Sequence, residues 1–235
     1  MRATFTVKPT GGLCNYLRVV FSYWLYCKKT NQRLVVLWIP TDECPGFFLD
    51  YFQPLEGVTF IEAFEPGIFV SYSGNRWHPD YNPYKMFIYD GLKPLNYIQN
   101  EINEKVDYMG HYIAVHIRRT DHSDLAIVNH SFTQDIDFID FIKEFPAHNV
   151  YIATDNRDTQ DDFVARFPLQ IKGVPWIEPI DSLRQTTFKQ AMIDLFVCIK
   201  ASKFMGSGYS SFSGTIQQFR QTCDSEGKFQ FTIPY

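Results

Sequence analysis

Residues 112–121 of the chain read YIAVHIRRTD and join an apolar run to a cluster of charged side chains. The first four residues are apolar and partly β-branched, which is typical of a strand in a sheet covered on both faces. The charges therefore follow the carboxyl end of a strand, the edge at which open α/β sheets bind ligands. Arg118 and Arg119 offer forked donors that suit a diphosphate. A nucleotide-linked substrate is the leading hypothesis, and solvated arginines paired with Asp121 and Asp124 are the ordinary alternative.

The composition limits the class of protein. With 235 residues and 45% hydrophobic content, the chain can bury a core as one large domain or two compact halves. A formal net charge of −4 argues against a broad nucleic-acid surface but allows a local basic cleft. Five cysteines without CxxC pairs indicate reduced thiols and no metal site. Lacking a signal segment or a long apolar run, the chain is expected to be soluble and cytoplasmic, with no transmembrane segment.

Hydrophobic periodicity predicts strands that alternate with helices, which is typical of parallel sheets in an α/β fold. In the first half we expect strands at 4–7, 34–38, 58–61 and 86–89, a helix at about 14–29 after a glycine turn, and a loop-rich stretch at 71–84. In the second half we expect strands at 111–117, 150–154 and 203–206, and helices at about 134–145, 159–167, 183–201 and from 211. A helix after Pro94 would connect two domains, 1–108 and 109–235.

Two further stretches of the second half carry candidate binding residues. Residues 206–214 read GSGYSSFSG, follow a strand and enter a helix. Such glycines, amides and hydroxyls suit phosphate, although a serine at a helix start is also an ordinary N-cap. Asp194 stands in the apolar helical run 191–199, where an unpaired carboxylate would cost several kcal/mol. Its partner is either a buried arginine or the N1–H and exocyclic amine of guanine.

Three other aspartates allow both a functional and a structural interpretation. Asp155 ends the strand at 150–154, so it shares the sheet edge with Arg118 or caps the next helix. Asp135 and Asp137 have the DxD spacing of metal-dependent sugar transferases. They also lie in the first turn of a predicted helix, where acidic side chains favour the positive end of the dipole. The structural interpretation of this pair is the preferred one.

Together these residues resemble the fucosyltransferase superfamily, which includes core α1,6-fucosyltransferases, bacterial nodulation fucosyltransferases and protein O-fucosyltransferases. The resemblance covers the second half almost throughout and the first half only at its glycine loop. It rests on residues 11–15, 116–121, 150–155 and 194–211. Cys14-Asn15-Tyr16 stands where relatives usually carry Gly-Asn-Gln.

The resemblance implies a GT-B-like pair of Rossmann-type domains facing a cleft. It also implies inverting, metal-independent transfer of L-fucose from GDP-fucose to a glycan acceptor, with no cofactor. Arg118 would hold the β-phosphate, and Arg119 and Asp121 would brace the motif. The remaining binding candidates are His116 and Asp194 at the guanosine, Asp155 on the nucleoside side, Ser210 and Ser211 at the diphosphate, and Gly12 and Asn15 near the phosphates or acceptor.

The general base must lie within hydrogen-bond reach of the acceptor hydroxyl. Asp124 is the preferred candidate, with Asp121 and His78 as rivals. Two other functions stay open at this point. One is the same fold with another nucleotide sugar as donor, and the other is a noncatalytic glycan- or nucleotide-binding module.

Overall fold

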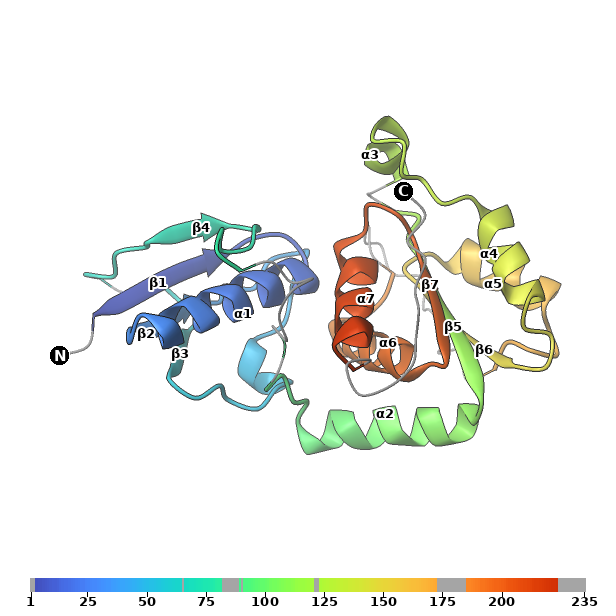
Figure 1. Ribbon diagram of the computed structural model, residues 1–235, viewed down its shortest axis with the longest axis horizontal. Helices are drawn as coiled ribbons and strands as arrows, with labels where there is room; N and C mark the ends of the chain where they lie inside the picture. Colours follow the sequence, from blue (N-terminus) through green and yellow to red (C-terminus); the bar gives the residue numbers. More distant parts are fainter. Residues whose placement is uncertain are drawn as a thin grey trace. The chain divides into compact units, whose positions relative to one another are not determined.

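The computed structural model describes residues 3–64, 66–81, 89, 91–120, 123–172 and 185–223. The chain divides into two compact units, each built around its own parallel sheet (Figure 1). Unit 1 comprises Met1–Ile39, Pro54–Leu92 and Gln217–Tyr235, and unit 2 comprises Pro40–Gln53 and Lys93–Ile216. Two parallel α/β units agree with the predicted fold class, while the cleft between them stays a prediction.

Unit 1 contains a four-stranded parallel sheet. The strands are β1 (Thr4–Pro9), β2 (Arg33–Leu37), β3 (Val58–Ile61) and β4 (Tyr72–Gly74), in the order β3-β2-β1-β4. Helix α1 (Leu13–Lys29) starts two residues after Gly11, whose φ of 84° turns the chain in a region that glycine favours. Its apolar face, with Leu17 and Val20 fully buried, packs on β1 and β2.

One element of unit 1 differs from the sequence prediction. Strand β4 lies inside the stretch at 71–84 that was expected to be a loop, and it pairs with the end of β1 through Val7, Lys8 and Pro9. With three residues, an edge strand is too short to show the alternation from which strands are predicted. The strand predicted at 86–89 lies outside the described residues except for Tyr89, which is in a turn.

Unit 2 contains the three-stranded sheet β6-β5-β7, with β5 (Tyr112–Ile117), β6 (Asn149–Thr154) and β7 (Lys203–Gly206) all parallel. One face carries α4 (Asp135–Lys143) and α5 (Arg157–Arg166), whose Phe138 and Phe163 are fully buried against the strands. The opposite face carries α6 (Phe188–Lys200) and the part of α7 (Ser211–Cys223) that belongs to unit 2, residues 211–216 (Figure 1). The short helix α3 (Ser123–Val128) and the 3-10 turn Phe48–Asp50 were not predicted.

Helix α2 (Asn96–Met109) belongs to unit 2, because it packs along α6 and buries Ile98 and Ile102 completely. The sequence instead assigned this helix to the first domain, with the boundary near Tyr108. An amphipathic pattern shows that a helix has a buried face but not which neighbour covers it. Division into domains 1–108 and 109–235 stays a prediction.

Two properties expected from the composition can be compared with the described residues. Four cysteines, Cys14, Cys27, Cys44 and Cys198, are buried, as predicted, and belong to no disulfide among the described residues. Within the described ranges, no helix has the length and apolar character required to cross a membrane.

Candidate functional site

The carboxyl ends of the three strands of unit 2 bring Arg118, Asp155 and Ser207 together. The Nη1 atom of Arg118 lies 2.6 Å from Oδ2 of Asp155, across the β5–β6 edge. The backbone N–H of Arg118 donates to Oγ of Ser207 at 2.8 Å, and this hydroxyl donates to the carbonyl of His116 at 3.2 Å. The sequence prediction that Arg118 and Asp155 share one sheet edge is confirmed. The contacts link the tips of all three strands. Asp155 holds the guanidinium, and Ser207 holds the backbone of Arg118.

Asp155 is the centre of this cluster. Besides Arg118, it accepts hydrogen bonds from the backbone N–H of Arg119 at 3.1 Å and from the hydroxyl of Thr120. The helix-capping alternative is wrong, because the next residue, Asn156, caps α5 by accepting the N–H of Thr159 at 2.9 Å. Both oxygens of this buried carboxylate are satisfied by residues of the arginine motif.

Arg119 turns toward α4 and not toward solvent. It pairs with the carboxylate of Asp135, and its guanidinium carbon lies 4.9 Å from the centre of the Phe132 ring. Asp137 accepts a hydrogen bond from the backbone N–H of Gln134 at 2.7 Å. This is the capping contact that an acidic residue in the first turn of a helix can make. These contacts agree with the structural interpretation of the DxD pair. Among the described residues, no group of three or more His, Cys, Asp or Glu side chains could hold a metal ion.

His116 points from β5 to the face of the sheet covered by α7. Its Nδ1 lies 2.7 Å from Oγ of Ser213, and its ring stacks on Phe212 at 4.7 Å. Burial, helped by the charge of Arg118, lowers the pKa of His116 to about 3. The imidazole is therefore neutral at physiological pH and can serve as a hydrogen-bonding or stacking group, not as a cation.

The loop after β7 leads into α7 at the same edge. Ser210 accepts the backbone N–H of Ser213 at 3.3 Å, which is the ordinary N-cap contact. Ser211 is the first residue of α7. A Cβ atom on Gly206 would lie 2.6 Å from Oγ of Ser213, so the glycine lets the helix approach the strand end. This close approach places the start of α7 beside His116.

Asp194 is buried on α6, in the same unit as the arginine cluster. Its Oδ1 accepts hydrogen bonds from the hydroxyl of Tyr151 and from Nε2 of Gln190, the latter at 2.6 Å. The alternative of a buried arginine partner is therefore wrong. Burial raises the pKa of Asp194 to about 6, against the opposing effect of these hydrogen bonds. Its hydrogen bonds are made with these two residues and not with the arginine motif. Its contact with guanosine stays a prediction.

Several residues of the site were not singled out in the sequence. Ser207 directly follows β7, so the argument from strand ends that indicated Arg118 and Asp155 applied to it as well. Thr120, Ser213, Tyr151 and Gln190 carry no comparable signal. Thr120, Ser213 and Tyr151 have partners that are distant in sequence, such as Asp194, which lies 43 positions after Tyr151. Gln190 lies one helical turn before Asp194 on α6.

Unit 1 holds two of the remaining predicted binding residues and one candidate base. Gly12 is the N-cap of α1, and a Cβ atom on Gly11 would lie 2.6 Å from Nδ2 of Asn15. The ring of His78 stacks on Tyr26 at 4.2 Å, and burial lowers its pKa. In unit 2, Asp124 is exposed in the first turn of α3, and Asp121 lies outside the described residues. The identity of the general base stays a prediction.

Solved structures of fucosyltransferases share the fold over most of the chain. NodZ α-1,6-fucosyltransferase soaked with GDP-fucose matches with a TM-score of 0.64 and 16% identity, over 93% of each chain. NodZ from Bradyrhizobium matches with a TM-score of 0.65 and 17% identity, over 92% of this chain and 93% of its own. POFUT1 in complex with GDP matches with a TM-score of 0.64 and 13% identity, over 93% of this chain and 94% of its own.

This chain has the fucosyltransferase fold. The predicted GT-B-like class is thereby confirmed at the level of the fold. At such low identity the likeness says nothing of individual residues. No protein-family model and no curated protein matches the sequence.

Proposed function

We propose that the chain is a glycosyltransferase that moves L-fucose from GDP-fucose to a glycan acceptor. The observation that carries the proposal is the Arg118–Asp155 pair, fixed at the sheet edge beside the start of α7. The fold is shared with NodZ soaked with GDP-fucose and with POFUT1 in complex with GDP, which supports a GDP-linked donor. A cytoplasmic location, suggested by the reduced cysteines, is part of the same proposal.

The pair would act on the charge that develops during transfer. As the bond between the sugar carbon and the β-phosphate oxygen breaks, its electron pair leaves with GDP and the sugar gains oxocarbenium character. Arg118 is already oriented by Asp155 and Ser207. It would therefore stabilise the departing diphosphate with little reorganisation. Because this interaction is stronger in the transition state than in the bound donor, it would lower the barrier to transfer.

The acceptor hydroxyl would attack the sugar carbon from the face opposite the diphosphate. A single displacement of this kind inverts the configuration at that carbon. The proton of the hydroxyl would pass to a carboxylate, for which Asp124 is the proposed base. Its exposure in α3 suits a group that must reach an incoming acceptor.

Nucleotide preference tests the proposed donor. GDP is expected to raise the melting temperature of the protein by several degrees at 100 times its dissociation constant, because a ligand of the native state alone stabilises it by about 2.7 kcal/mol. UDP and ADP at equal concentration should shift it less. A larger shift with UDP or ADP would contradict the GDP-linked donor and favour another nucleotide sugar. No shift with any of them would contradict a nucleotide site.

Chelation tests metal independence. With Arg118 supplying the positive charge at the diphosphate, fucosyl transfer is expected to be unchanged by EDTA within about twofold. The measurement compares initial rates in EDTA with rates in added manganese or magnesium. Loss of transfer in EDTA, with recovery in manganese, would overturn this part of the mechanism and return attention to Asp135 and Asp137.

A further inference from the structure

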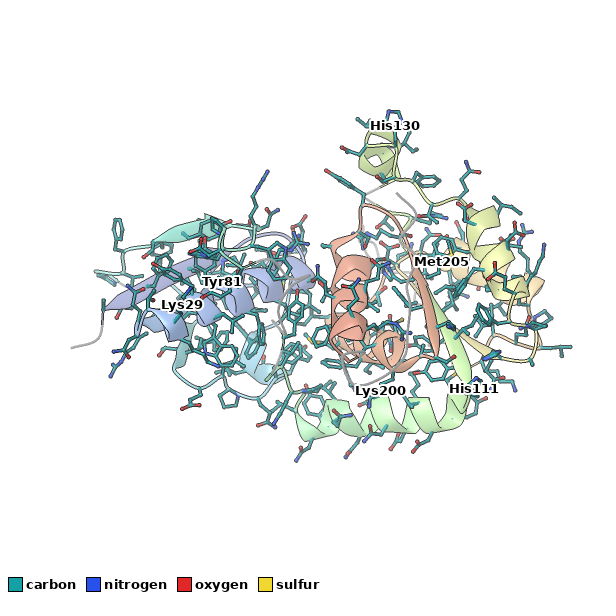
Figure 2. All side chains as sticks on the ribbon, in the orientation of Figure 1. Lys29, Tyr81, His111, His130, Lys200 and Met205 are labelled. Atoms are coloured by element: carbon teal, nitrogen blue, oxygen red, sulfur yellow. The ribbon has the colours of Figure 1, made fainter. Side chains whose placement is uncertain are left out.

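Residues 131–135, which connect α3 to α4, contact the site from two directions within unit 2. We name this segment the brace. It begins after His130, labelled at the end of α3 in Figure 2, and it ends at the first residue of α4. One end of the brace meets the loop that follows β7, and the other meets Arg119.

At the loop, the brace contacts the backbone of Gly208. Oγ1 of Thr133 accepts the backbone N–H of Gly208 at 2.8 Å. A Cβ atom on Gly208 would lie only 1.9 Å from the carbonyl oxygen of Ser131. No side chain fits there without separating the two segments, so Gly208 is needed for the brace to approach.

At the arginine motif, the contact is between side chains. Asp135 pairs with the guanidinium of Arg119, which also lies over the ring of Phe132. The same guanidinium donates to the carbonyl of Arg118 at 3.1 Å. The brace therefore reaches the residue next to Arg118 as well as the loop next to Ser210.

The loop also has a conformation that requires support. Tyr209 follows Gly208 and has a φ of 57°, in the left-handed region that bulky side chains avoid. Such a backbone conformation persists only where its surroundings hold it. Here it is held on one side by the Gly208–Thr133 hydrogen bond and on the other by the Ser210 cap of α7.

We infer that Thr133 is a positioning residue for the diphosphate, acting through Gly208 on the loop at 207–210. This inference rests on the proposed function, since it assumes that GDP binds at this edge. Thr133 itself does not touch the ligand. Its hydroxyl fixes the amides and serines of the loop in the arrangement that would receive phosphate oxygens.

The test compares the affinities of Thr133 variants for GDP and for guanosine, measured by isothermal titration calorimetry. Thr133→Val keeps the shape and removes the hydroxyl acceptor, and Thr133→Ser keeps the hydroxyl. Thr133→Val is expected to lower the affinity for GDP roughly tenfold, which is the usual effect of losing one hydrogen bond. The affinity of Thr133→Val for guanosine, which lacks the diphosphate, should change by less than about twofold. Thr133→Ser should bind GDP as tightly as the wild type. Thr30→Val, at the end of α1, is the matched control and should bind GDP as the wild type does.

Each outcome has a defined meaning. Unchanged GDP affinity in Thr133→Val, or equal losses for GDP and guanosine, would overturn the positioning role. Thr133→Ala provides the same comparison if the valine variant fails to fold. Failure of the wild-type protein to bind GDP at all would instead contradict the proposed function, before any variant is considered.

Discussion

Arg118→Ala is expected to lower fucosyl transfer at least 100-fold, by analogy with the removal of one donor to a developing oxyanion. The side chain lies at the carboxyl end of β5, is mostly buried, and is oriented by Asp155. Its charge is placed to interact most strongly with the diphosphate as the sugar leaves. The effect should therefore appear mainly in kcat, measured as GDP released from GDP-fucose in the presence of acceptor.

The matched control is Arg166→Ala, which removes the same side chain from an exposed aspartate pair on α5. Transfer by this variant should match that of the wild type. Near-normal turnover in Arg118→Ala would contradict the mechanism. A large loss in both variants would point to a general effect of lost arginine charge.

Asp155→Ala is expected to have the second largest effect, and it should act on both stability and transfer. The carboxylate binds Arg118, the backbone of Arg119 and the hydroxyl of Thr120. Removing one partner of a buried ion pair typically costs about 3–5 kcal/mol, because the other charge stays buried. Transfer should fall at least tenfold, since Arg118 loses its orientation. Chemical denaturation and initial rates provide the two measurements.

Asp162→Ala is the control for this prediction, because Asp162 pairs with Arg166 at an exposed position. Exposed pairs contribute about 1 kcal/mol or less, so this variant should lose little stability and no activity. If Asp155→Ala matched Asp162→Ala in both measurements, the cluster around Asp155 would have neither the structural nor the functional role assigned to it.

The sequence predicted the part of the site that depends on neighbouring strands. The apolar run ending at Ile117 and the run ending at Thr154 are both typical of buried parallel strands, whose carboxyl ends meet at one edge. Arg118 and Asp155 follow these ends directly, so their proximity could be predicted without knowledge of any other contact. The glycine turn before α1 was also predictable, because it depends only on residues that are adjacent in the sequence.

Contacts between segments distant in sequence could not be predicted in the same way. The pattern around Asp194 showed that a buried carboxylate needs donors, but not that one of them is Tyr151, which lies 43 positions earlier on β6. Arg119 was expected to brace the motif, yet nothing local indicated that its partner is Asp135, across the α3–α4 connection. Short elements such as α3 and β4 were missed because they contain too few residues to show a period.

The most direct test of the account is a crystal structure of the protein with GDP. The diphosphate is expected at the carboxyl edge of the β6-β5-β7 sheet, with phosphate oxygens within hydrogen-bond distance of the Arg118 guanidinium and of the residues that begin α7. GDP bound elsewhere, or bound at this edge with its phosphates turned away from Arg118, would contradict the central claim.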